Sequence, residues 1–163
     1  MYNVLINKIR LLGGCQKFVI LILWFIVIYL FSSQAAAESS ELSGKIVNSI
    51  APVAPEIIKS SLTFLVRKSA HIFLYFVLGI LTANLLVAYK IRANLVYVYS
   101  LAFVFVYAIT DEIHQLFVAG RSGEVRDVLI DTVAGAVGIA LYLGIRKLHS
   151  TKRASKNTKN VVE

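Results

Sequence analysis

Four apolar segments constrain this chain of 163 residues more than any other feature. They cover residues 18–31, 69–89, 95–110 and 128–145. A helix needs about 20 apolar residues to cross the hydrocarbon core of a bilayer, and shorter runs span it where the bilayer thins. Because an unpaired backbone amide or carbonyl is costly in lipid, each segment is expected to be an α-helix. The sequence therefore predicts an all-α, polytopic membrane bundle with about four transmembrane helices.

Composition supports this class and narrows the functions. Hydrophobic residues make up 58% of the chain and charged residues 16%, against roughly 25% charged residues in soluble domains. The chain holds one cysteine, which excludes a disulfide scaffold and a thiolate cage for a metal. A net charge of +8 would suit nucleic acid, but the position of the charges gives it another explanation.

The basic residues divide unevenly between the two sides of the predicted bundle. Eleven of them, with one acid, precede the first segment, join the second to the third, or follow the fourth. The other side carries six basic residues and eight acids. Since Lys and Arg mark the cytoplasmic side, both termini are expected inside the cell, in a multi-pass protein of the cell membrane. The excess charge then faces membrane lipids, and no nucleic-acid partner is predicted.

This topology divides the chain into five parts. Residues 1–17 form a cytoplasmic N-terminus, 18–31 the first transmembrane helix, and 32–66 an external amphipathic connection. Residues 67–145 form a core with three transmembrane helices, and 146–163 a basic cytoplasmic tail.

Two of these parts carry further signals. Small residues follow the first apolar run in Ser33-Gln34-Ala35-Ala36-Ala37, as in a signal-peptide cleavage site, so residues 18–31 are either retained as a helix or removed. In the external connection, apolar residues recur at helical spacing on both sides of two prolines, which predicts one or two short amphipathic helices.

Polar side chains gather at the outer ends of the last three segments. Arg67, His71 and Tyr75 follow at steps of four, so they share one helix face, and Asp127 and Asp131 are also four apart. Because these stripes lie at one membrane level, they are expected to converge on an outward-facing polar pocket. The candidates for catalysis are His71, Asp111, Glu112 and Asp127, and those for substrate binding are Arg67, Lys68, Tyr75, Gln115, Arg121 and Asp131.

These residue types suit several kinds of chemistry. Guanidinium groups bind phosphate in a bidentate manner, and a histidine beside a carboxylate suits acid–base catalysis. A metal could use His71, His114, Asp111, Glu112 and Asp127, but no dense ligand spacing such as HExxH is present. No metal is assigned, and no other cofactor is identified. The structural alternative is that Arg67 or Arg121 only pairs with Asp127 or Asp131 and holds the helices together.

The polar motifs resemble the VanZ-like family. The resemblance runs from about residue 67 to residue 138 and depends on the order and spacing of several motifs. It departs from the family at Asp131, where asparagine is common, and at Leu74, where an acid often stands. The motifs that carry it are Arg67-Lys68-Ser69-Ala70-His71 with Tyr75, Asp111-Glu112-Ile113-His114-Gln115, Gly120-Arg121, and Asp127 with Asp131 and Gly135.

The resemblance implies a small bacterial membrane protein, in a family named for a member that lowers susceptibility to the glycopeptide teicoplanin. Two functions follow as hypotheses. In the first, the pocket binds or modifies an anionic, lipid-linked component of the cell envelope. In the second, the protein is non-catalytic and its charges only assemble the bundle or a partner complex. A transporter is less favoured, because the chain has neither an inverted repeat nor a polar path to the inner face. The oligomeric state is not assigned.

Overall fold

The computed structural model describes the backbone of residues 2–34 and 36–162, with side chains over 13–34 and 37–151. These residues form five helices and, within the described ranges, no strand. The prediction of an all-α bundle with four membrane-spanning helices is confirmed, because α1, α3, α4 and α5 are each long and apolar enough to cross a membrane. The helices are α1 (Tyr2–Ser32), α2 (Ala36–Ile50), α3 (Glu56–Ala88), α4 (Ala93–Gln115) and α5 (Val125–Val162).

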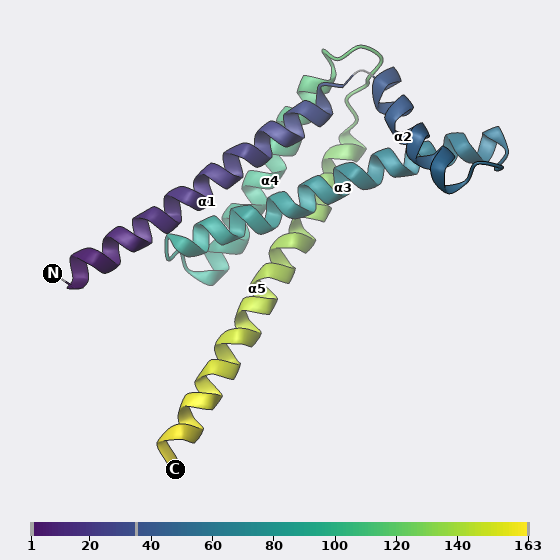
Figure 1. The fold of residues 1–163 in the computed structure, drawn as a ribbon. Coiled ribbons are helices and arrows are strands. Elements are labelled where there is room, and N and C mark those ends of the chain that lie inside the picture. The colour runs from purple at the N-terminus through teal and green to yellow at the C-terminus, as the bar shows by residue number, and fades with distance from the viewer. Residues whose placement is uncertain (1, 35, 163) are drawn as a thin grey trace.

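Helix α3 lies at the centre of the bundle and contacts each of the other four helices (Figure 1). Its most extensive contact is with α5, which it crosses at an angle. The start of α1, the α3–α4 turn and the end of α5 lie away from α2, and the α4–α5 loop lies towards the α2 end. We call this the α2 end of the bundle. The arrangement agrees with the topology expected from the charges, and the side of the membrane on which each end lies stays a prediction.

Three helix boundaries differ from the expectation. Helix α1 begins at Tyr2 and not at residue 18. Helix α3 begins at Glu56 and not near residue 67, because no glycine or proline interrupts residues 56–68 after Pro55. The second amphipathic segment is therefore the first part of a membrane-spanning helix. Helix α5 likewise continues beyond the apolar run into the basic tail and ends at Val162.

Helix α2 lies within the connection that was expected to be amphipathic. One face, with Ser39, Ser43 and Val47, is buried where α2 meets α3. The opposite face leaves Leu42 and Ile46 nearly half exposed. An exposed apolar face of this kind is typical of a helix that lies at a membrane surface.

Glycines allow α3 and α5 to approach closely. A Cβ atom at Gly79 would overlap the backbone carbonyl oxygen of Gly135, and a Cβ atom at Gly138 would overlap that of Phe76. Because backbone atoms cannot rotate away, any larger residue at these positions would force the helices apart. Small residues are the usual solution where membrane helices pack at such short range.

Helix α1 packs into the same core, and its retention or removal as a signal peptide stays a prediction. Leu21, Ile28 and Ser32 are buried, and the indole Nε1 of Trp24 donates a hydrogen bond to the carbonyl oxygen of Leu74 at 2.9 Å. Loss of this helix would expose these groups. Some residues used for the cleavage and topology predictions lie outside the described residues: Ala35, Glu163 and the side chains of Lys8, Arg10, Ala36, Lys152, Arg153, Lys156 and Lys159.

Candidate functional site

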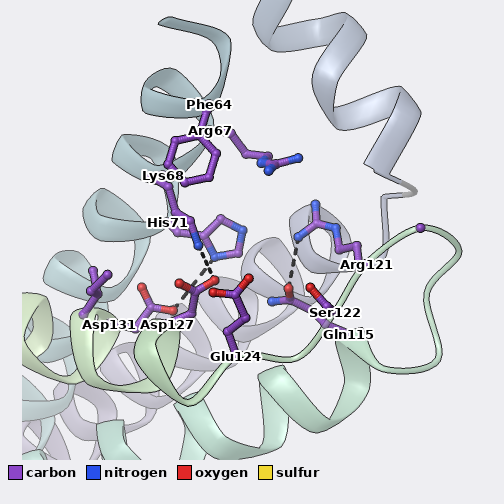
Figure 2. Close-up of a pocket in the computed structure, with 12 residues that line it drawn as sticks. Phe64, Arg67, Lys68, His71, Gln115, Arg121, Ser122, Glu124, Asp127 and Asp131 are labelled. Atoms are coloured by element: carbon purple, nitrogen blue, oxygen red, sulfur yellow. Dashed lines mark hydrogen bonds and ion pairs between the residues drawn. The ribbon is translucent and has the colours of Figure 1, made fainter. Parts of the chain in front are cut away.

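A polar cavity of about 100 Å³ opens at the α2 end of the bundle, between α3, α5 and the α4–α5 loop (Figure 2). This is several times the volume that one ordered water needs, so a phosphate-sized group fits. We call it the polar pocket. Seven of the ten residues predicted for the site line it, and they come from three segments of the chain. Its lining is Phe64, Arg67, Lys68, His71, Gln115, Gly120, Arg121, Ser122, Glu124, Asp127, Ile130 and Asp131.

Three cationic side chains line the polar pocket, and only one of them forms an ion pair with a described residue. Lys68 pairs with the Asp127 carboxylate across α3 and α5. Arg121 donates hydrogen bonds to the Gln115 side-chain oxygen at 3.3 Å and to the Gln34 carbonyl at 3.0 Å, neither of which carries a charge. Arg67 lies with its guanidinium carbon 5.7 Å from the centre of the Phe64 ring.

The two guanidinium groups influence one another. The pKa of the Arg121 guanidinium is lowered from its ordinary value. The larger cause is partial burial, and the second is the positive charge of Arg67. An anion between Arg67 and Arg121 would offset both causes, since it would neutralise the repulsion and replace lost solvation. This part of the polar pocket is therefore suited to a phosphate or carboxylate.

Asp111 lies behind the polar pocket and joins three helices. Its Oδ2 atom accepts hydrogen bonds from Ser32 at 2.8 Å, from Tyr75 at 3.1 Å and from Gln115 at 3.4 Å. Both Ser32 and Tyr75 are fully buried, so neither hydroxyl has water as an alternative partner. Tyr75 was predicted to bind substrate, and Asp111 was predicted to act in catalysis. The structure places both side chains beneath the cavity lining.

Glu112 also lies beneath the lining and fixes the α4–α5 loop. Its carboxylate accepts a hydrogen bond from the backbone nitrogen of Glu124 at 2.8 Å and another from Gln115 at 3.2 Å. The loop between them reverses at Gly120, which has a φ of 73°. In that left-handed conformation glycine is favoured, since it has no Cβ. Glu112 thus holds Arg121 and Glu124 at the polar pocket through the loop.

The floor of the polar pocket is acidic. Asp131 is 2% exposed, and its Oδ2 atom lies 4.0 Å from the Nδ1 atom of His71. Its carboxylate makes no hydrogen bond to another side chain within the described residues. The Oδ1 atom of Asp127 is likewise buried without a hydrogen-bond partner. Burying a carboxylate without partners is costly, so these oxygens are suited to bind a group that enters the pocket.

Two possibilities that the sequence left open about individual residues differ from the contacts in the structure. The structural alternative paired Arg67 or Arg121 with Asp127 or Asp131, but among the described residues Lys68 takes Asp127. His114 was offered as a metal ligand beside His71. Its Nε2 atom instead lies 3.1 Å from the Ser33 hydroxyl, and its ring packs on Tyr29 with centroids 4.8 Å apart. Residue 114 is three positions from Asp111 on the same face of α4, and both side chains meet the end of α1, Asp111 at Ser32 and His114 at Tyr29 and Ser33.

Sequence reasoning also missed members of the site. Ser32 donates a hydrogen bond to Asp111 and directly follows the apolar run 18–31. The signal that could have identified it is a polar residue at the same membrane level as the predicted site. Phe64 lies in a stretch that was predicted as a short external amphipathic helix and not as part of a membrane-spanning helix. Ser122 and Glu124 line the polar pocket from a loop, where spacing gives no information about direction.

An apolar groove adjoins the polar pocket. It lies on the outer surface of α3 and α5, where it is lined by residues such as Phe73, Phe76 and Val133, and Ile130 borders both. Phe73 is 59% exposed and Val133 is 62% exposed, although both are strongly apolar. In a bilayer this surface faces hydrocarbon chains. The groove thus provides an apolar surface next to the polar pocket, with Ile130 in the lining of both.

Four long apolar helices with a polar pocket at one end of the bundle define a helical integral membrane protein. The family model described as VanZ/LLP1 matches residues 17–147, which cover most of the chain. The chain belongs to the VanZ/LLP1 family, and the predicted resemblance is confirmed. The match is longer than the predicted range of motifs and includes the second half of α1. Neither the curated proteins nor the solved structures give a match.

Proposed function

We propose that the polar pocket binds the anionic headgroup of a lipid-linked component of the cell envelope. The observation that carries this proposal is the pair of guanidinium groups on Arg67 and Arg121, which line one small cavity without an ion pair to a described residue. In Figure 2 they lie on the opposite side of the cavity from Asp127 and Asp131. A phosphate would contact the arginines, and hydroxyl groups of the same headgroup would donate to the carboxylates.

The apolar groove supports a ligand with a lipid tail. Because Ile130 borders both surfaces, a headgroup in the polar pocket can continue directly into a hydrocarbon chain along α3 and α5. A soluble anion would make no use of the groove. The uneven distribution of basic residues supports a pocket on the outer face of the cell membrane, with both termini in the cytoplasm.

Modification of the ligand is a second candidate function. The 4.0 Å approach of His71 to Asp131 favours it, since a carboxylate beside an imidazole can support proton transfer from water or a hydroxyl. A purely structural role has its own support in the Lys68–Asp127 ion pair and in the hydrogen bonds that converge on Asp111. Arg121 could also serve such a role, since it donates hydrogen bonds to the backbone carbonyls of Gln34 and Phe31. The structural role leaves Arg67 unexplained, because its guanidinium has no hydrogen bond or ion pair with a described residue.

We further propose that the polar pocket lowers susceptibility to teicoplanin, as the resemblance to the family implies. In a sensitive Gram-positive host, the wild-type chain and the Arg126→Gln variant are expected to protect, because Arg126 does not line the polar pocket. His71→Ala is expected to abolish protection at equal membrane abundance. Inhibitory concentrations, read beside immunoblots of the membrane fraction, measure this. Equal protection by wild type and His71→Ala would contradict it.

A further inference from the structure

We infer that His71, Asp111 and Asp131 bind one divalent transition-metal ion at the floor of the polar pocket. Each residue offers one ligand atom, and these atoms lie within 4.8 Å of one another. Zinc is held at about 2.0–2.2 Å by imidazole nitrogen and carboxylate oxygen, so small side-chain rotations would bring all three atoms into range. The residues come from α3, α4 and α5, and the ion would join the three helices that surround the pocket.

The charges at this floor favour a cation. Asp111 is 5% exposed and Asp131 is 2% exposed, so both carboxylates lie away from bulk water. Within the described part of the chain, no lysine or arginine lies within ion-pair distance of Asp111 or Asp131. The lysine that lines the same pocket, Lys68, is paired with Asp127. Two adjacent carboxylates in a medium of low dielectric repel one another and lack solvation. A divalent ion would offset both effects at once.

The surroundings of Asp111 are those of a supported ligand. Ser32, Tyr75 and Gln115 all donate to its Oδ2 atom, which fixes the carboxylate and leaves Oδ1 without a hydrogen bond to the described side chains. In metal sites, hydrogen-bonding partners of this kind orient the residues that bind the ion and contribute to its affinity. Asp131 has no such partner within the described residues, and its oxygen atoms face the polar pocket, which His71 also lines.

One imidazole and two carboxylates select a class of ion. Imidazole suits zinc, iron, nickel and copper, while carboxylates also suit manganese. Three protein ligands with an open position are typical of zinc sites that bind a further molecule. The open position would face the cavity, beside the site proposed for the anionic headgroup. The inference does not depend on that headgroup, because ion binding is measured on the protein alone.

The test uses the full-length chain in detergent, without a polyhistidine tag, stripped with a chelator and then titrated with Zn²⁺ against a chromophoric competitor. The wild type is expected to bind one zinc ion per chain. Asp131→Asn is expected to lower the affinity by about 100-fold or more, beyond the roughly 10- to 100-fold cost of changing a supporting residue. Glu124→Gln is the matched control, because it removes one acid from the same cavity outside the ligand set, and its affinity should equal that of the wild type.

A second readout uses Co²⁺, whose visible absorption is weak in water and intensifies when protein ligands hold the ion in a four- or five-coordinate site. His71→Gln is expected to remove that intensified absorption while far-ultraviolet circular dichroism stays that of a folded helical protein. Absence of zinc binding by the folded wild type would overturn the inference, as would equal binding by Asp131→Asn and Glu124→Gln. If the folded wild type binds no zinc but binds an anionic lipid, the metal site is wrong and the proposed function stands.

Discussion

Replacing Gly138 by alanine is expected to destabilise the folded bundle by about 1–3 kcal/mol, the usual cost of overpacking a close contact. The added Cβ would overlap the backbone carbonyl oxygen of Phe76, and no side-chain rotation relieves that overlap. Helices α3 and α5 would have to separate, and the two faces of the polar pocket would separate with them. Unfolding of the purified protein in detergent, followed by circular dichroism, measures the effect.

Gly144→Ala provides the matched control on the same helix. A Cβ at Gly144 meets no atom within 4 Å, so the same chemical change adds helix propensity without a clash. This variant is expected to be as stable as the wild type or slightly more stable. Equal destabilisation by both substitutions would mean that the loss reflects helix flexibility and not close packing of α3 against α5.

Lys68→Asp is expected to cost about 3–5 kcal/mol, the range measured when one partner of a buried ion pair is removed. The side chains of Lys68 and Asp127 are 21% and 16% exposed, and the substitution would place a second acid beside an Asp127 carboxylate whose Oδ1 atom already lacks a partner. Adding Asp127→Lys restores opposite charges across α3 and α5, so the double variant should recover much of the loss. Membrane abundance and unfolding in detergent report both steps.

The control for this reversal is Lys45→Asp, which breaks an ion pair with Glu41 between side chains that are about 70% exposed. Pairs at the surface contribute little, so no measurable change is expected. If the double variant stays as unstable as Lys68→Asp alone, the Lys68–Asp127 pair does not hold the helices together. Recovery of stability in the double variant would assign Lys68 and Asp127 a structural role. Binding by the polar pocket would then be tested at the arginines.

The spans and the level of the site could be predicted from the sequence, because both depend on properties that repeat along the chain. Apolar runs located the four membrane helices, and steps of four placed Arg67 and His71 on one face of α3. The shared membrane level of the polar residues then indicated a single site. Seven of the ten predicted residues line one cavity for this reason.

What could not be predicted is how far each helix is rotated about its own axis. That rotation is set by close contacts such as Gly79 against Gly135 and Gly138 against Phe76, which join segments far apart in the sequence. It decides that Asp111 lies between Ser32 of α1 and Tyr75 of α3, while His114 contacts Tyr29 and Ser33. The same rotation brings Lys68, and not an arginine, to Asp127.

The most direct test of the polar pocket as a binding site compares the affinity of phosphatidic acid for purified wild type, Arg67→Gln and Arg126→Gln, with phosphatidylcholine as the uncharged-headgroup reference. Arg67 forms no hydrogen bond or ion pair with a described residue, so its removal should leave the bundle intact. The account predicts preference for phosphatidic acid and an about 10- to 100-fold loss in Arg67→Gln, as expected for charge-assisted hydrogen bonds, with wild-type affinity in Arg126→Gln. Equal affinity in all three folded proteins, or no preference between the two lipids, would contradict it.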